Sequence, residues 1–283
     1  MQTLLKSASV EVRIQGDGPF IIIGEKINPT GRAKLAQALQ AGDFETVRKL
    51  AVQQVEAGAD VLDVNVGVPG LDEVALMPQV VKVVAEAANV PLCLDSANPQ
   101  ALAAALAVAP GKPLVNSING EEKTLNAILP IVRDRGAAVI ALTMDDGGIP
   151  NDPEARVAIA DRIMNRAAQM GIAAEDVVID PLVMAVGADS RAAWVTLRTI
   201  ERVRQMLGAN VNLGASNVSF GLPDRRTLNQ IFLAMAIGAG ATCAITDPVK
   251  LTATARAADL MSGRDAYARR YLKYCRAHPV DKA

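Results

Sequence analysis

The sequence predicts a (β/α)8 barrel, the TIM-barrel class of α/β fold, on three observations. Short apolar runs alternate along the chain with longer segments of helical period. Eight such runs occur within 283 residues, which suits a closed barrel of eight strand–helix units. The runs are mainly apolar rather than alternating, as expected for parallel strands that are buried on both faces. An open, doubly wound sheet is the alternative architecture.

The predicted elements follow one another without a break in composition. The strands are expected at 20–24, 61–64, 91–94, 113–115, 137–142, 177–179, 211–213 and 242–245. The helices are expected at 46–57, 72–88, 99–109, 121–135, 153–170, 191–207, 226–238 and from 249 onward. We expect the residues before Phe20 to cover the bottom of the barrel, and those after about Ser262 to form an extra helix. With no linker or low-complexity segment, residues 1–283 are predicted to form a single domain.

Residues with local conformational preferences mark the boundaries of these helices. Glycine is expected in the left-handed conformation just after a helix ends. It stands at Gly58, Gly136, Gly171, Gly208 and Gly240. A capping residue followed by proline marks a helix start, because proline suits the first helical position. Such pairs are Asn98–Pro99, Asp152–Pro153 and Asp247–Pro248.

Composition excludes several classes of function. With 29 Lys plus Arg against 30 Asp plus Glu, the net charge is −1, and a general nucleic-acid binder would carry a basic excess. No apolar stretch is long enough to span a bilayer, and the first residues do not resemble a secretory signal. Cys93, Cys243 and Cys275 lack disulfide or metal spacing, so we expect a cytoplasmic protein. His278 is the single histidine, which disfavours histidine-dependent nucleophiles and the usual zinc sites.

Polar residues follow the apolar runs, where a barrel would bring them to one mouth. An Asp or Asn there often caps the next helix, and this interpretation suits Asn98, Asp152 and Asp247. It suits four other residues less well, because each ends an apolar strand with little local reason to be polar. These are Asp95, Asn116, Asp180 and Asn217. Asp63 and Asn65 lie two apart and so share one face of a strand.

A mouth rich in acceptors suits a ligand with several N–H donors in a row. A pterin ring is such a ligand, since its 2-amino group and ring N–H can meet one carboxylate in two hydrogen bonds. A cluster of carboxylates could instead hold Mg²⁺, which remains the second interpretation.

The motifs at the strand ends resemble those of pterin-binding methyltransferases, above all methyltetrahydrofolate:corrinoid (iron-sulfur) protein methyltransferases. The folate domain of cobalamin-dependent methionine synthase and dihydropteroate synthase are more distant relatives. The resemblance runs from about Phe20 to the final helices, with one motif per strand. The motifs are IGEKIN at 23–28, LDVNVG at 62–67, CLDS at 93–96, NS at 116–117, LTM at 142–144, IDP at 179–181 and SNVS at 216–219. It implies a dihydropteroate-synthase-like barrel in a homodimer.

The resemblance also implies roles for individual residues. Pterin recognition falls on Asp95, Asn116 and Asp180, with Asp95 also orienting the hydrogen-bond network. Asn217 matches the asparagine that binds the reacting N5 and would stabilise the transition state. Motif positions lining the same mouth, with less defined roles, are Glu25, Asn28, Asp63 and Asn65. Arg225 or Arg226 is a candidate for the glutamate tail of the folate.

The reaction implied is methyl transfer between N5 of tetrahydrofolate and the cobalt of a separate corrinoid protein, in either direction. Because His278 lacks the context of a corrinoid-binding loop, the cobalamin is expected on the partner, and no bound metal is expected. No residue is an obvious strong general acid, so we expect the N5 proton to come from solvent. The alternatives are a metal-dependent lyase or aldolase on the same fold, and a non-catalytic pterin-binding subunit.

Overall fold

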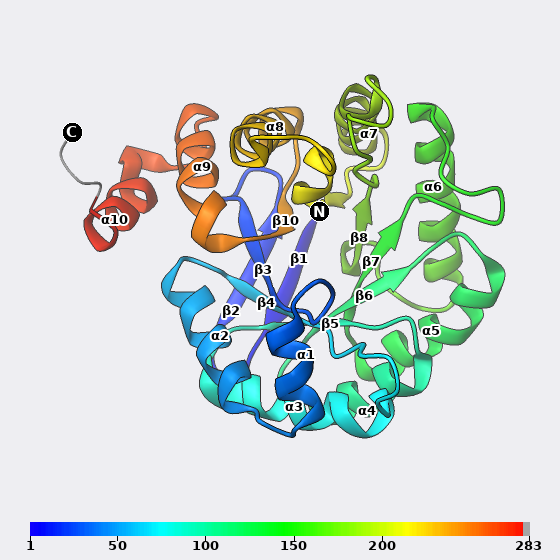
Figure 1. The fold of residues 1–283 in the computed structure, drawn as a ribbon. Helices are drawn as coiled ribbons and strands as arrows, with labels where there is room; N and C mark the ends of the chain where they lie inside the picture. Colours follow the sequence, from blue (N-terminus) through cyan, green and yellow to red (C-terminus); the bar gives the residue numbers. More distant parts are fainter. Residues whose placement is uncertain (280–283) are drawn as a thin grey trace.

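The computed structural model describes residues 1–279, which form a closed barrel of eight parallel strands surrounded by helices (Figure 1). The strands are β3 Ile21–Ile27, β4 Val61–Val64, β5 Leu92–Asp95, β6 Leu114–Ile118, β7 Ala138–Leu142, β8 Val177–Asp180, β9 Asn210–Val211 and β10 Cys243–Thr246. They pair in chain order from β3 to β9, and β10 pairs with β3. The Ile245 amide donates to Leu213 O at 2.8 Å and closes the last gap, so the predicted barrel is confirmed.

Helices cover the outside of the barrel at the predicted places. They are α2 Glu45–Glu56, α3 Glu73–Ala87, α4 Pro99–Val108, α5 Glu122–Arg135, α6 Pro153–Gln169, α7 Ala192–Met206, α8 Arg225–Ala239 and α9 Pro248–Met261. Asn98, Asp152 and Asp247 each cap the following helix with a side-chain oxygen, as expected. The five boundary glycines all have positive φ. A short helix, α1 Ala33–Gln40, was not expected from the sequence.

The segment before Phe20 is a hairpin that fills the bottom of the barrel. Its strands are β1 Gln2–Lys6 and β2 Glu11–Gln15, which pair antiparallel. Leu5 and Ile14 are fully buried among the apolar side chains of the barrel interior. The Asn210 side chain donates to Thr3 Oγ1 at 3.0 Å and to Ile14 O at 2.8 Å. The prediction that this segment covers the bottom is confirmed.

The expected extra helix is α10 Arg269–Ala277, which lies outside the ring of helices beside α9 (Figure 1). Arg270 bonds Asp60 at 3.1 Å, and Asp265 accepts from the first amides of the helix. These contacts fasten the C-terminal helix to the barrel. No helix among residues 1–279 is both long and apolar enough to cross a membrane.

The seventh predicted strand is shorter than expected. It was predicted at 211–213, but β9 is Asn210–Val211. Gly214 then turns the chain into a short 3-10 helix, η2 Ala215–Ser219. Asn217 therefore lies on this helical turn, and the expectation that it directly ends a strand was wrong.

Candidate functional site

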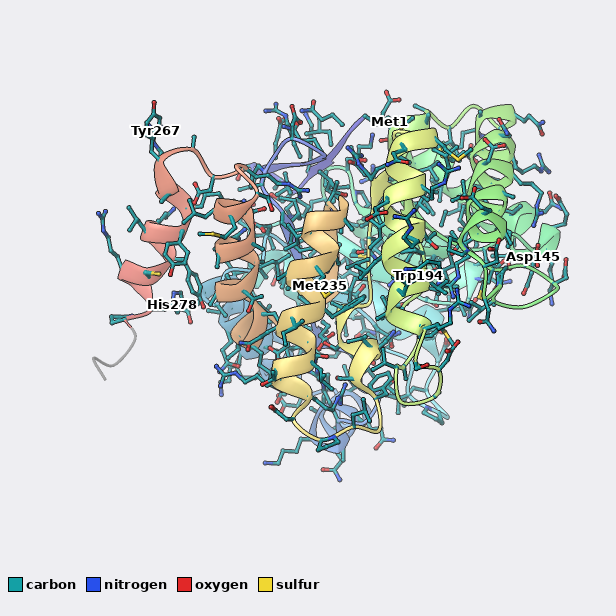
Figure 2. All side chains as sticks on the ribbon, turned by 90° about the horizontal axis from the view of Figure 1, so that it is seen from above. Met1, Asp145, Trp194, Met235, Tyr267 and His278 are labelled. Carbon is teal, nitrogen blue, oxygen red and sulfur yellow. The ribbon has the colours of Figure 1, made fainter. Side chains whose placement is uncertain are left out.

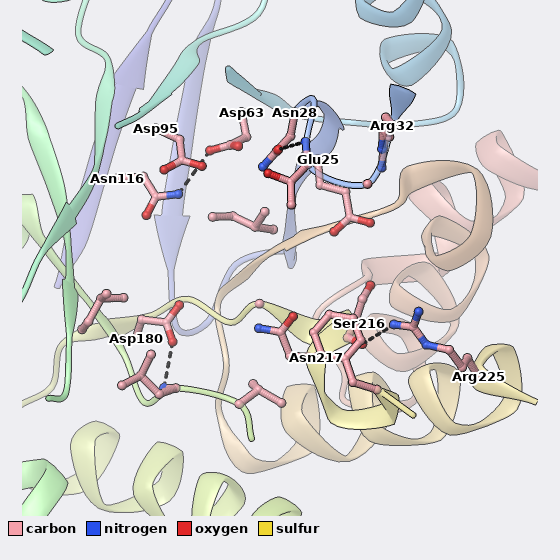
Figure 3. Close-up of a pocket in the computed structure, with 18 residues that line it drawn as sticks. Glu25, Asn28, Arg32, Asp63, Asp95, Asn116, Asp180, Ser216, Asn217 and Arg225 are labelled. Carbon is pink, nitrogen blue, oxygen red and sulfur yellow. Dashed lines mark hydrogen bonds between the residues drawn. The ribbon is translucent and has the colours of Figure 1, made fainter. Parts of the chain in front are cut away.

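The carboxyl ends of the strands enclose a cavity of about 690 Å³ (Figure 3). Seven of the eight residues predicted for the site line it: Glu25, Asn28, Asp63, Asp95, Asn116, Asp180 and Asn217. The eighth, Asn65, is not part of the lining. Its side-chain amide instead donates to Asp95 Oδ2 at 3.0 Å. Asn65 therefore acts on the cavity through Asp95.

One side of the cavity holds a cluster of two carboxylates and an amide. Asp63 lies on β4, Asp95 ends β5, and Asn116 lies beside Asp95 on β6. Asn116 Nδ2 donates to Asp63 Oδ1 at 3.3 Å (Figure 3). The pairing of β6 with β7 shifts register just after Asn116, and such irregularities commonly redirect side chains at the ends of strands.

Burial changes the protonation of this cluster. Loss of hydration raises the pKa of Asp63 well above its usual range, and the nearby Asp95 carboxylate raises it further. Burial likewise raises the pKa of Asp95 to about 6, although the hydrogen bond from Asn65 opposes this. The sequence showed no obvious acid because both residues have low pKa values in water. Their enclosure makes them able to hold a proton near neutral pH.

Asp180 is fixed from two directions. Leu182 N donates to Asp180 Oδ1 at 2.8 Å, and Asn212 Nδ2 donates to Oδ2 at 2.7 Å. Burial raises the pKa of Asp180 to about 6, and both hydrogen bonds oppose the shift. Asn212 is fully buried and was missed by the sequence analysis, where it sits inside an apparently apolar strand.

A buried arginine holds the loop after β8. The Arg156 guanidinium donates to Pro181 O at 2.5 Å and to Leu182 O at 2.8 Å. Its side chain is almost wholly enclosed, although α6 presents it as an ordinary charged helix residue in the sequence. Arg156 thus supports the loop that fixes Asp180.

Asn217 faces the cavity from η2, between the Asp180 side and the Arg225 side (Figure 3). A Cβ added at Gly214 would stand 2.9 Å from Asn217 Nδ2, so this glycine leaves room for the amide. Arg225 braces the turn: Nε donates to Ser219 Oγ at 3.0 Å, and Nη2 donates to Ser216 O at 2.9 Å.

The side of the cavity opposite Asp95 and Asp180 contains cations. Arg32 and Arg225 both line it, with Glu25 between them (Figure 3). Arg32 Nη1 donates to Lys26 O at 2.8 Å. Burial raises the pKa of Glu25, and the nearby Asp247 carboxylate adds to the shift. The cavity is therefore anionic at one end and cationic at the other.

No group of three or more His, Cys, Asp or Glu side chains within residues 1–279 is arranged to hold a metal ion. Asp63, Asp95, Asn116 and Asp180 are each held by a hydrogen bond to a neighbouring side chain or backbone amide. This arrangement presents acceptors and amides to an organic ligand.

Together, these features define a TIM-barrel protein whose mouth is lined by carboxylates and amides. The model of the family described as pterin binding enzyme matches residues 24–247. The chain belongs to this family of pterin-binding enzymes, as its motifs implied.

Curated relatives are similar over most of this chain. A methylcorrinoid:tetrahydrofolate methyltransferase of Eubacterium limosum is 32% identical over 259 residues, covering 90% of this chain and 95% of that protein. A methionine synthase of Mycobacterium tuberculosis is 31% identical over 250 residues, covering 83% of this chain. The matched region is only 21% of that methionine synthase.

Solved structures show the same fold at lower sequence identity. A dihydropteroate synthase of Xanthomonas albilineans, solved with indole-2-carboxylic acid and 6-chloroguanine, has a TM-score of 0.68 at 19% identity. The match covers 94% of this chain and 100% of that chain. One from Stenotrophomonas maltophilia has a TM-score of 0.68 at 19% identity, covering 94% and 99%. At this identity the likeness establishes the barrel fold alone.

Proposed function

We propose that this protein transfers a methyl group between N5 of tetrahydrofolate and the cobalt of a corrinoid carried by a separate protein. The proposal depends chiefly on one observation. The family motif residues converge on one cavity that is acidic at one end and offers Asn217 beside it. The similarity to the Eubacterium limosum methyltransferase over nearly its whole length supports this reaction.

We assign pterin recognition to Asp95, Asn116 and Asp180. A carboxylate can accept two parallel hydrogen bonds from the 2-amino group and an adjacent ring N–H of a pterin. Asp180 is held by Asn212 and Leu182, so its orientation is set before the ligand arrives. Because the cluster is largely enclosed, these bonds discriminate strongly against ligands that leave an acceptor unpaired.

Asn217 is assigned to the reacting nitrogen. An amine leaves poorly unless its nitrogen is protonated or hydrogen-bonded as the methyl group departs. An amide that donates more strongly to N5 in the transition state lowers the barrier without itself titrating. The room that Gly214 leaves beside Asn217 Nδ2 allows this amide to adjust to its ligand.

The proton for N5 can come from the site itself. The sequence suggested solvent, but Asp63 and Asp95 are neighbouring carboxylates whose pKa values burial raises. We propose that this pair stores one proton and exchanges it with N5 through the polar network. In the reverse direction the same network accepts the proton, since both directions share one transition state.

The first experiment mixes the purified protein with 5-methyltetrahydrofolate and cob(I)alamin and follows the cobalt spectrum for methylcobalamin. The reverse reaction starts from methylcobalamin and tetrahydrofolate. Product formation that resists a chelator supports the proposal. The absence of any folate binding would instead favour the metal-dependent lyase or aldolase. Folate binding without turnover, even with a corrinoid protein supplied, would favour the non-catalytic subunit.

We also propose that the protein is a homodimer. Apolar side chains on neighbouring helices α7 and α8 are about half exposed, namely Trp194, Ile231 and Met235. Figure 2 labels Trp194 on α7 and Met235 on α8. Replacing Ile231 and Met235 by Asp should convert a dimer to a monomer in sedimentation. Val52→Asp on α2 is the matched control, since Val52 is similarly exposed elsewhere. A wild-type protein that sediments as a monomer would contradict the proposal.

We propose a reducing, cytoplasmic location. Cys93 and Cys243 are buried in the barrel interior, and Cys275 is also unpaired among the described residues. Burial raises the pKa values of the Cys93 and Cys243 thiols, which keeps them unreactive. Fractionation of the producing cells tests the location.

A further inference from the structure

A smaller cavity adjoins the candidate site at the carboxyl ends of β5 and β6, beside the start of α5. Its volume is about 250 Å³, and its lining shares Asp95, Asn116 and Leu142 with the 690 Å³ cavity. Asp95 and Asn116 are paired neighbours on the two strands (Figure 3). They stand between the two cavities, so the Asp95 carboxylate can be reached from either side. We call the smaller cavity the side chamber.

The side chamber is lined by polar groups that suit water. Ser96, Ser117, Asn119 and Thr124 contribute three hydroxyls and an amide. A hydroxyl can both donate and accept a hydrogen bond, and ordered water needs about two to four polar partners. Since one water molecule occupies about 30 Å³ in the liquid, the chamber has room for several of them.

The outer end of the side chamber reaches the molecular surface. Ala97 is exposed and Thr124 is half-buried, and both are part of the lining. Thr124 Oγ1 donates to Glu121 Oε2 at 3.4 Å, and Glu121 stands just before α5. The chamber thus runs from solvent, between Ala97 and Thr124, to Asp95 at its inner end.

The reaction proposed for the adjoining site consumes a proton. When 5-methyltetrahydrofolate gives its methyl group to cobalt(I), the N5–methyl bond breaks and its electron pair stays on N5. N5 takes up one proton, while cobalt is oxidised to cobalt(III) as it binds the methyl group. A folate in the larger cavity, with the corrinoid above it, would close the mouth to water. A proton path that avoids the mouth would keep the Asp63–Asp95 pair supplied in that state.

Other titratable groups act on this carboxylate pair. Burial is the main cause of the raised pKa values of Asp63 and Asp95. Glu25 on β3 raises the pKa of Asp63 further, and Glu73 on α3 does the same for the pKa of Asp95. The hydrogen bond between the Cys93 thiol and Asp63 opposes the shift. The pair can therefore take up a proton from water near neutral pH.

From this arrangement we propose that the side chamber is a proton inlet, through which water supplies the Asp63–Asp95 pair while folate is bound. The inference rests on the proposed function of the adjoining site. Ala97 and Thr124 form the entrance of this path, and Asp95 lies at its end. In the reverse direction the same water path releases the proton, because both directions share one transition state.

The test is a double-mixing experiment with free cob(I)alamin. The protein is mixed with 5-methyltetrahydrofolate at about pH 8.5, where the pair holds fewer protons, and then with cob(I)alamin at about pH 6.5. Formation of methylcobalamin is followed after the second mixing. Wild type should at once reach the rate of a complex kept at the lower pH throughout, because protons enter through the chamber. Thr124→Leu fills part of the chamber, so its rate should be about tenfold lower until the folate dissociates.

Two further variants complete the test. Ala97→Phe is a second blocking variant at an exposed position, where folding is little affected, and it should show the same delay. Thr124→Ser is the matched control, since it keeps the hydroxyl and the open chamber, and it should respond like wild type. When kept at about pH 6.5 throughout, all the complexes should transfer the methyl group at rates within about twofold of one another.

Blocking variants that respond to the pH change as fast as wild type would overturn the inference. An equal loss of rate without the pH change would also overturn it, because it would show that Thr124 and Ala97 only support packing. A delayed response in the wild type would show that protons enter through the mouth, and the inference would again be wrong. In each of these cases methylcobalamin still forms, so the proposed function stands. If wild type forms no methylated corrinoid under any condition, even with a corrinoid protein supplied, the proposed function fails and the inference fails with it.

Discussion

At the scale of single residues, the candidate site depends on polar groups that are held by other polar groups. Asn65 bonds Asp95, Asn116 bonds Asp63, and Asn212 bonds Asp180. Asn217 differs, since it faces the cavity with no side-chain hydrogen bond to another residue in 1–279. Side chains whose orientation is already fixed by hydrogen bonds are well placed to recognise a ligand. The Asn217 amide has no such bond, so it is free to form a hydrogen bond with the substrate during the reaction.

Asn217→Ala should therefore affect reaction more than binding. We expect methyl transfer to slow by about 10²–10³-fold, as for the loss of one transition-state donor. Folate affinity should fall by less than about fivefold, since the pterin contacts remain. Single-turnover rates and calorimetry with the same preparation measure the two effects. Equal losses in both would show that Asn217 is a uniform binding contact.

The substitution Asp63→Asn tests how much the buried carboxylate pair, Asp63 and Asp95, lowers the free energy of unfolding. Because the pKa of Asp63 is raised in the folded state, that state binds more protons than the unfolded chain above about pH 4. Wild-type stability should then fall as pH rises through the folded pKa of the pair. The amide keeps an acceptor for Asn116 but removes the charge, so the variant should be about 0.5–2 kcal/mol more stable at pH 8.

Denaturant unfolding at pH 5 and pH 8 measures this effect. The variant should show a weaker pH dependence than wild type and slower methyl transfer. Loss of stability at pH 8 would mean that Asp63 makes a net favourable contact when charged.

At the scale of elements, the strands and helices place the site through close backbone packing. Gly24 on β3 lies where an added Cβ would stand 2.5 Å from Gln54 Oε1 and 3.3 Å from the Ala59 Cβ. Gln54 is buried on α2 and accepts from Lys26 N at 2.8 Å. Contact between β3 and α2 thus positions the strand end that carries Glu25.

Gly24→Ala should destabilise the fold by about 1–3 kcal/mol, because the added methyl group would displace the Gln54 amide and disturb its hydrogen bond from Lys26 N. Gly238→Ala is the matched control on α8, where an added Cβ meets no atom within 4 Å. The control should stabilise the protein by about 0.5–1 kcal/mol through higher helix propensity. Thermal unfolding of both variants shows whether the loss of stability in Gly24→Ala is caused by crowding at β3 or by the loss of a glycine in general.

At the scale of the whole molecule, the N-terminal hairpin belongs to the same core as the barrel. Leu5 and Ile14 pack with interior residues of β3 to β8 and of β10, including Ile23 and Cys243. We propose that the chain is one domain, in which the hairpin and the barrel unfold together.

Leu5→Ala should then destabilise the entire barrel by about 2–4 kcal/mol, because it leaves a cavity at the bottom of the interior. Met261→Ala, at a residue that is 82% exposed, should change stability by less than about 0.5 kcal/mol. Unfolding followed by circular dichroism and by Trp194 fluorescence should give one coincident transition. Separate transitions would show that parts of the chain unfold independently, which would contradict the single domain.

The sequence predicted most of the fold because its strands are buried on both faces and its helices carry local end marks. Asp152 before Pro153 and Gly136 after Arg135 mark their boundaries whatever surrounds them. The hairpin, α1 and η2 were not predicted. Each of these elements is short: the two hairpin strands and η2 have five residues each, and α1 has eight. Leu5 and Ile14 are the fully buried apolar residues of the hairpin, and two such residues do not predict a hairpin from the sequence alone. Their role becomes visible only where they pack against the barrel interior.

By itself, the sequence determined the barrel class and the family, and it predicted seven of the polar residues that line the mouth. Strand order follows from the repeated strand–helix pattern, and parallel strands bring their carboxyl ends together. Only the tertiary structure decided how these residues act. Burial depends on neighbours distant in the chain, so the raised pKa values of Asp63 and Asp95 and the support from Asn212 appear only in the closed barrel. The same closure brings the starts of α8 and α9 together around a second cavity, which is lined by Arg226 and Lys250 among others.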